Sequence, residues 1–473
     1  MIEQKSSRNS SKKGKGTKTR MKTDGSHRNG RERLGSRMGF IMLSAGCAIG
    51  CGNVWKFPWL CGENGGGSFV LVYILCLMVL GLPVMTMELS MGRAAQTSPM
   101  YMFQKLAKGH GSGWRIPGAL ALVGNVALMA FYTVVAGWIL NYFFRFATGH
   151  IEGLSFGRMI SNPGENVLFL LITVVLTFAV LSFSLQGGLE RITKYMMTAL
   201  LVLMLAIMGY GLTLPGAGEG MRFYLVPDFS KMNSGTVVAA MNQAFFTISV
   251  GIGSMAIFGS YIGKDRSMMG EAGTVILLDS IVALMAGAII FPACFSYGVE
   301  VTDGPGLLFN TMADVFNHLQ GGRWWGTVFF LFMAFAALST VLAVCENILA
   351  MTREMFGWSR KKGSLICGSV IFLLSLTTAL GYSVLNFQPF AEGSAWLDLW
   401  DFIVSTNILP LGCLLYALFC CNRFGWGWDA FVAEANTGRG LKIRPWMKPL
   451  FRFVVPVIIL FLYVYGMVTF RWK

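Results

Sequence analysis

Two short glycine-rich segments that also carry hydroxyl and amide side chains interrupt long apolar stretches of this sequence. The first is Gly-Cys-Ala-Ile-Gly-Cys-Gly-Asn at residues 46–53, and the second is Thr-Ile-Ser-Val-Gly-Ile-Gly-Ser at residues 247–254. In hydrocarbon, a backbone that leaves its helix is tolerated only where its N–H and C=O groups line a buried polar site. Broken helices of this kind typically bind a small ligand or ion, so the two segments predict a transporter with a binding site at the membrane midplane.

Long apolar spans are expected to carry these two segments through a membrane. The chain is 54% hydrophobic and 13% charged, whereas soluble domains contain roughly 25% charged residues. The glycine-rich segments fall in the first and sixth of eleven predicted spans. A membrane helix needs ~20 apolar residues, and the spans lie near residues 38–60, 67–91, 117–146, 165–184, 192–213, 236–261, 272–298, 325–351, 364–382, 397–421 and 450–470.

The charge distribution predicts the orientation of the chain. Its net charge is +15, and the first 37 residues hold 12 of the 38 Lys and Arg residues. Because positive segments remain on the cytoplasmic side, we expect a multi-pass protein of the cell membrane with a cytoplasmic N-terminus and, after eleven spans, an extracellular C-terminus. A tail that lies near anionic lipid accounts for the basic residues, so no nucleic-acid partner is expected.

The remaining reactive residue types point away from an enzyme. The ten Cys residues lie in or near apolar spans and the four His residues are scattered, so neither a disulfide framework nor a zinc site is predicted. No glycine-rich loop of the Walker type is present, which argues against ATP as the energy source.

The broken segments and their flanks closely resemble the neurotransmitter:sodium symporter family, in particular its bacterial eleven-span members. The resemblance is carried by Arg-Met-Gly-Phe at 37–40, the run from Gly46 to Pro58, Glu-Asn-Gly-Gly-Gly at 63–67, and Phe-Phe-Thr-Ile-Ser-Val-Gly-Ile-Gly at 245–253. It implies an all-α integral membrane protein with the LeuT-type fold, in which eleven transmembrane helices include a 5+5 inverted repeat with broken helices 1 and 6. The expected organisation is a basic cytoplasmic tail (1–36), two five-helix repeats (37–213 and 236–421) and an eleventh helix with an extracellular C-terminus (450–473).

By resemblance, the backbone N–H groups near Gly50 and Gly52 and the hydroxyl of Tyr132 hold a substrate carboxylate at the positive end of a half-helix. A tyrosine in a membrane helix is, by itself, more often a packing residue. An apolar lining implies a neutral hydrophobic amino acid as the substrate, and Gly50 stands where monoamine carriers have an aspartate. The complete substrate set is Ala48, Gly50, Gly52, Leu128, Tyr132, Phe246, Thr247, Ser249, Ile252, Thr340 and Val344.

The resemblance also implies two Na⁺ sites built from the oxygen ligands that suit a hard cation. Outside this family context, a Ser-Thr pair such as Ser339-Thr340 usually bonds to its own helix. The first site takes Ala48, Asn53, Thr247 and Asp279, and the second takes Gly46, Ile49, Ala336, Ser339 and Thr340.

Asp279 departs from many family members, which have an asparagine there and a chloride ion nearby. A fixed carboxylate carries the same charge as an asparagine with bound chloride, so Asp279 is expected to substitute for chloride and make transport chloride-independent. The alternative is a protonated Asp279 that fills a polar niche.

Gate residues follow by the same resemblance. Lys56 and Asp401 match an outer charged pair, whereas Arg31 and Glu354 match an inner pair that Tyr261 supports. Glu88 and Glu346 are expected to form hydrogen bonds with the unwound sixth helix. Residues 301–323 are expected to form either a lid or a plain amphipathic loop helix. Leu34 and Thr198 depart from the family pattern, where tryptophan and proline are common.

Together these features predict a sodium-coupled symporter that imports its substrate by alternating access, as a monomer or loose oligomer in the bilayer. Two other classes remain open. One is a transceptor that senses an amino acid with little transport, and the other is an ion channel. Saturable flux and countertransport distinguish a carrier from both.

Overall fold

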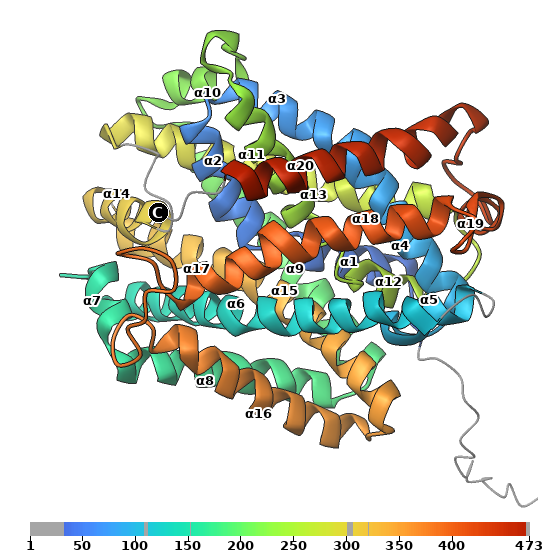
Figure 1. Cartoon of the computed structure of the whole chain (residues 1–473). Helices are drawn as coiled ribbons and strands as arrows, with labels where there is room; N and C mark the ends of the chain where they lie inside the picture. Colours follow the sequence, from blue (N-terminus) through green and yellow to red (C-terminus); the bar gives the residue numbers. More distant parts are fainter. Residues whose placement is uncertain (1–32, 108–111, 152, 300–305, 320, 470–473) are drawn as a thin grey trace, which may run out of the picture. The chain divides into compact units, whose positions relative to one another are not determined.

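The computed structural model describes residues 33–107, 112–151, 153–299, 306–319 and 321–469. Within these residues the regular structure is helical, apart from two isolated β-bridges. A helix satisfies each backbone polar group within its own segment, as hydrocarbon requires. The predicted all-α class is therefore confirmed (Figure 1). The predicted tail over residues 1–36 falls almost entirely outside the described residues, and so do residues 470–473.

The helices follow one another from α1 to α20 with π-helical or 3₁₀ turns between some of them. Those of the first half are α1 (Arg37–Ala48), α2 (Phe57–Glu63), α3 (Gly67–Cys76), α4 (Leu82–Ala95), α5 (Pro99–Leu106), α6 (Ile116–Thr148), α7 (Phe156–Ser161), α8 (Pro163–Ser182), α9 (Arg191–Gly211) and α10 (Ala217–Leu225). Those of the second half are α11 (Ser234–Thr247), α12 (Ser254–Gly259), α13 (Met268–Tyr297), α14 (Met312–His318), α15 (Gly322–Phe356), α16 (Arg360–Ala379), α17 (Trp396–Asp401), α18 (Leu409–Cys421), α19 (Trp428–Ala435) and α20 (Val455–Thr469).

The apolar spans of the sequence become membrane-length helices. In the described part of the chain, nine helices are long and apolar enough to cross a membrane, and each overlaps a predicted span. A tenth span is the pair Arg37–Ala48 and Gly52–Glu63, which is bent by 52° at its break. The remaining predicted span, 236–261, corresponds to α11 and α12, which six non-helical residues separate. The total of eleven crossings and the two inverted repeats stay predictions.

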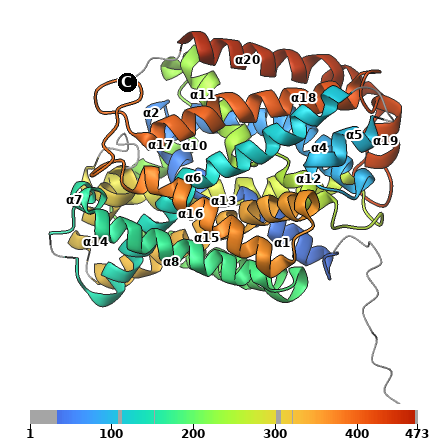
Figure 2. The same ribbon diagram turned by 60° about the horizontal axis from the view of Figure 1, so that its bottom comes forward.

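Two groups of helices contact each other around the broken segments. One group comprises α6, α8, α15 and α16, which pack together in sequence-distant pairs. The other comprises α1, α3, α4, α11, α12 and α13. Figure 1 shows α8 and α16 side by side, and Figure 2 shows the same pair from another direction. Helix α15 is apolar and buried around much of its circumference, as expected of a helix in the centre of a membrane protein.

The segment predicted as a lid or loop helix is partly described. Residues 306–319 contain a π-helical turn (Leu307–Thr311) followed by α14. The ring of Phe309 stacks on Phe156 with centroids 4.6 Å apart and lies 5.0 Å from the ring of Tyr142. The segment therefore packs on α6 and α7, while residues 301–305 and 320 lie outside the described residues.

Candidate functional site

The first break separates α1 from the π-helical turn Gly52–Lys56. Helix α1 ends at Ala48, and Ile49 follows with extended backbone angles. A Cβ atom on Gly50 would lie 2.3 Å from the Tyr132 hydroxyl oxygen and 2.5 Å from Thr340 Oγ1. Glycine is thus required here by close approach, because both hydroxyl groups contact the space that any side chain would fill.

The second break separates α11 from α12 and contains three residues in the left-handed region. Ser249 has φ of 51°, whereas Gly251 and Gly253 have φ of 94° and 79°. The Glu88 carboxylate on α4 holds this backbone, since its two oxygens accept from the N–H groups of Gly251 at 2.9 Å and Met255 at 3.1 Å. The expected contact of Glu88 with the unwound segment is present.

Two buried asparagines that the sequence prediction missed support the same segment. Asn125 Nδ2 on α6 donates to the Ile252 carbonyl at 2.7 Å, and Asn347 Nδ2 on α15 donates to Ser254 Oγ at 2.7 Å. The signal for them was an amide within each apolar span. Glu346, expected at the unwound segment, accepts from the hydroxyl of Tyr261 at 3.0 Å.

A small cavity lies between the two breaks. Its volume is about 20 Å³, so the two groups of helices leave little more than the space of one water molecule. Most of the predicted substrate residues line it, whereas Thr247 and Val344 do not, and Cys47 and Leu409 were not predicted. The lining consists of Cys47, Ala48, Gly50, Gly52, Leu128, Tyr132, Phe246, Ser249, Ile252, Thr340 and Leu409.

Tyr132 brings a hydroxyl group to the unwound part of the first helix. The N–H group of Cys51 donates to the Tyr132 hydroxyl oxygen at 2.7 Å. On the other side of the cavity, Ser249 Oγ donates to the carbonyl of Cys47 at 3.1 Å. The cavity is therefore apolar at Leu128 and Leu409 and polar along the two broken backbones, where the Tyr132 hydroxyl group also lies.

A buried carboxylate lies beside the first break. Asp279 on α13 is fully buried and accepts from Asn53 Nδ2 at 2.8 Å, from the Thr247 hydroxyl at 3.3 Å and from the Tyr73 hydroxyl at 3.4 Å. Each of these donors is neutral, and among the described residues no Lys, Arg or His forms an ion pair with Asp279. The side chains predicted for the first ion site, Asn53, Thr247 and Asp279, thus lie together, and Ala48 lies on the adjoining cavity wall.

The residues predicted for the second ion site lie around Thr340 on α15. Its Oγ1 lies 3.2 Å from the carbonyl oxygen of Gly46 and 3.4 Å from those of Ile49 and Ala336. Ser339 Oγ lies 2.9 Å from the Ala336 oxygen. Because a hydroxyl group has a single hydrogen, Thr340 donates to one of these acceptors at a time. The cluster is thus rich in oxygen atoms, the ligands that hard cations prefer.

The residues predicted for the outer gate lie together beside the small cavity. Lys56 Nζ is 3.7 Å from Asp401 Oδ2 and 4.2 Å from the ring centroid of Phe246. A second cavity of about 140 Å³ is lined by these three residues and by Tyr132, which also lines the small cavity. Phe246 and Tyr132 are therefore shared by both cavities.

The residues predicted for the inner gate are only partly described, since Arg31 lies outside the described residues. Glu354 Oε2 accepts from the N–H group of Ser98 at 2.7 Å. The Tyr261 carbonyl accepts from the N–H group of Leu34 at 3.2 Å, so the chain before α1 is attached to the end of the sixth span. Thr198, where proline was expected, donates its hydroxyl to the Lys194 carbonyl at 2.9 Å and remains within α9.

Comparison with known proteins gives one consistent result. The chain matches the Sodium:neurotransmitter symporter family over residues 31–152 and 146–473. It is 35% identical over 448 residues to YhdH, an uncharacterized sodium-dependent transporter of Bacillus subtilis strain 168, covering 92% of this chain and 98% of that protein. It is 31% identical over 456 residues to an uncharacterized sodium-dependent transporter of Haemophilus influenzae, covering 92% and 98%.

A solved structure supports the same relationship. The crystal structure of MhsT in complex with L-phenylalanine superposes with a TM-score of 0.83 at 36% sequence identity. The match covers 92% of this chain and 99% of that one.

Proposed function

The chain belongs to the sodium:neurotransmitter symporter family and has the LeuT-type fold of a sodium-dependent transporter, and we propose that it imports a neutral hydrophobic amino acid together with Na⁺ by alternating access. The multi-pass architecture places it in a membrane. The observation that carries the proposal is the buried Asp279 carboxylate with its neutral donors.

Asp279 favours a cation as cargo for an electrostatic reason. An unpaired buried charge costs several kcal/mol, and hydrogen bonds from neutral groups offset only part of that cost. A Na⁺ ion beside Asp279, Asn53 and Thr247 removes the penalty. The oxygen cluster around Thr340 provides a second place for Na⁺ without any acidic side chain.

The substrate class follows from the walls of the central cavity. Leu128, Ile252, Phe246 and Leu409 offer apolar contact, which suits a hydrophobic side chain. The crowding at Gly50 leaves no room for an aspartate that would bind a free amine. An amino acid whose carboxylate reaches Tyr132 and the backbone of the first break fits these constraints, and MhsT supports this class because it was solved with L-phenylalanine.

The transport cycle uses the two cavities in sequence. Substrate enters past Lys56 and Asp401, and Phe246 and Tyr132 then separate it from the outside. In this proposal the substrate carboxylate also completes the first Na⁺ site, so each ligand raises the affinity for the other by the same factor. Release follows when the inner side opens and the sodium gradient gives the direction.

Uptake into proteoliposomes tests this function. A panel of labelled aliphatic, aromatic and polar neutral amino acids is offered with and without an inward Na⁺ gradient. Accumulation of one or a few hydrophobic amino acids that requires the gradient and saturates supports the proposal. Na⁺-dependent binding without accumulation refutes it in favour of a sensor, and non-saturating flux refutes it in favour of a channel.

Chloride independence rests on Asp279 and has its own test. Wild-type uptake is expected to persist when gluconate replaces chloride, because the fixed carboxylate already balances the cation. Asp279→Asn removes that charge and is expected to weaken Na⁺ activation by tenfold or more, with chloride restoring part of it. Asp429→Asn, on the exposed start of α19, is the matched control. Wild-type uptake that collapses in gluconate contradicts the assignment.

We also propose the predicted orientation, with a cytoplasmic N-terminus and two inverted repeats at residues 37–213 and 236–421. The basic residues before the first span support it. A membrane-impermeant thiol reagent tests this orientation in intact cells that carry a single cysteine at Lys362 or at Asp398, both of which are exposed. Labelling from outside is expected at position 398 and absent at position 362, and labelling at position 362 from outside contradicts the orientation.

A further inference from the structure

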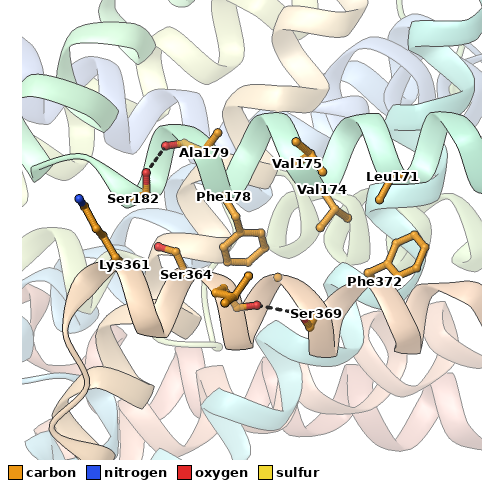
Figure 3. Close-up of a pocket in the computed structure, with 12 residues that line it drawn as sticks. Leu171, Val174, Val175, Phe178, Ala179, Ser182, Lys361, Ser364, Ser369 and Phe372 are labelled. Carbon is orange, nitrogen blue, oxygen red and sulfur yellow. Dashed lines mark hydrogen bonds between the residues drawn. The ribbon is translucent and has the colours of Figure 1, made fainter.

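An apolar groove lies away from the transport site, between α8 and α16. It has a volume of about 500 Å³, which is in the range of ligand pockets. Figure 3 shows Leu171, Val174 and Val175 on α8 and Phe372 on α16 along its apolar part. Val175 is 57% and Leu171 is 44% exposed, so the groove opens toward the surrounding lipid.

Polar groups gather at one end of this groove. Figure 3 shows Lys361, Ser364 and Ser182 near one another there. Ser364 is only 2% exposed, and its Oγ has no hydrogen-bond partner among the described residues. A buried hydroxyl without a partner is costly, which indicates that this group has a ligand the chain itself does not supply.

Lys361 provides the positive charge at the same end. Its neighbour Arg360 is engaged, since Arg360 Nη2 lies 2.5 Å from Glu346 Oε2. Among the described residues, by contrast, no acidic side chain pairs with Lys361. Lys361 also lies in the first turn of α16, where the helix dipole favours an anion.

The length of the groove matches that of a lipid acyl chain in one leaflet. Lys361 and Phe372 are eleven residues apart on α16, which corresponds to about 16 Å at 1.5 Å per residue. The hydrocarbon thickness of one leaflet is half of about 30 Å. An acyl chain of one leaflet therefore fits between Phe372 and Lys361, with its headgroup at the end that the predicted orientation places in the cytoplasm.

We propose that the α8–α16 groove binds one anionic phospholipid of the cytoplasmic leaflet, with an acyl chain along Val175 and Phe178, its phosphate beside Lys361, and a hydrogen bond from Ser364. Basic pockets between helices on the cytoplasmic side recognise anionic headgroups in this way. The site is separate from the transport cavity and does not depend on which substrate is carried.

Native mass spectrometry of the delipidated full-length protein tests the proposal. Phosphatidylglycerol and phosphatidylcholine of equal chain length are titrated separately. One tightly bound phosphatidylglycerol is expected, held at least fivefold more tightly than phosphatidylcholine. Lys361→Gln is expected to abolish that preference, since one Lys near an anionic surface contributes about that factor. Lys362→Gln, one residue along and exposed, is the matched control and is expected to keep it.

Two further variants test the phosphate contact and the apolar part of the groove. Ser364→Ala is expected to weaken the binding of both lipids by a similar factor and to keep the preference for phosphatidylglycerol, because both lipids carry the phosphate that accepts from the hydroxyl group. Val175→Trp narrows the apolar part and is expected to lower the binding of both lipids. Equal binding of the two lipids to the wild type overturns the proposal, as does an equal effect of Lys361→Gln and Lys362→Gln. A dimer that excludes lipid adducts also overturns it, because a second copy would then cover this face.

Discussion

Substitution of Gly50 by alanine tests how tightly the predicted substrate and ion sites are joined. The new Cβ would lie 2.3 Å from the Tyr132 hydroxyl and 2.5 Å from Thr340 Oγ1. Each oxygen has to retreat by about 1 Å to reach an ordinary 3.4 Å contact, and overpacking of this kind costs about 1–3 kcal/mol. Both displaced hydroxyl groups belong to proposed ligand shells.

We expect Gly50→Ala to weaken the apparent affinity for Na⁺ and for substrate by about 5- to 150-fold, the factor that corresponds to this energy. The assay is initial uptake into proteoliposomes as a function of Na⁺ and of substrate. Gly209→Ala is the matched control, because Gly209 lies within α9 and a Cβ there meets no atom within 4 Å. Wild-type affinities in a correctly folded Gly50→Ala protein would refute the reasoning.

A double variant distinguishes a steric clash from general damage. Tyr132→Phe removes one of the two oxygen atoms that the new methyl group strikes. If the clash is the cause, the melting temperature of Gly50→Ala/Tyr132→Phe falls by less than the sum of the single effects. Strict additivity contradicts the structural explanation.

Three other substitutions follow from the contacts. Thr340→Val removes a hydroxyl group from the carbonyl cluster and is expected to lower the affinity for Na⁺ about tenfold. The measurement is uptake as a function of Na⁺ concentration, and an unchanged Na⁺ dependence argues against an ion site there. Glu88→Gln replaces one of the two acceptor oxygens with an NH₂ donor, which leaves one of the two backbone N–H groups without an acceptor. It is expected to destabilise the protein by about 1.5–3 kcal/mol, measured by thermal unfolding in detergent, and a loss below about 0.5 kcal/mol argues against this role. Lys56→Gln breaks a partly exposed pair with Asp401 and is expected to change stability by less than about 1 kcal/mol. A larger loss of stability there indicates that the pair is buried in the membrane protein.

The sequence was sufficient for the helical class because its signal is local. Burial of ~20 consecutive apolar residues in lipid needs no knowledge of their neighbours, so the predicted spans coincide with helices. The breaks were predictable because their signal is local too. Gly251 and Gly253 adopt left-handed backbone angles, which glycine allows and most other residues avoid. The match to the family profile confirms the resemblance that the motif at residues 46–58 indicated.

The choice of partners was much less predictable. Leu409 lines the cavity although it stands in an unremarkable apolar run, and Val344 does not, although it lies one helical turn after Thr340. The supporting contacts of Asn125 and Asn347 were also missed. An amide in an apolar span signals a buried polar contact but does not identify its partner.

Local composition thus determined that this chain is a helical membrane protein with two broken segments. The tertiary structure decided which atoms meet at those breaks. Asn53 and Asp279 are 226 positions apart in the sequence, yet their side chains lie 2.8 Å from each other. The physical reason is that hydrophobicity and backbone preference act within a few residues, whereas a buried charge is satisfied only by groups that packing brings together.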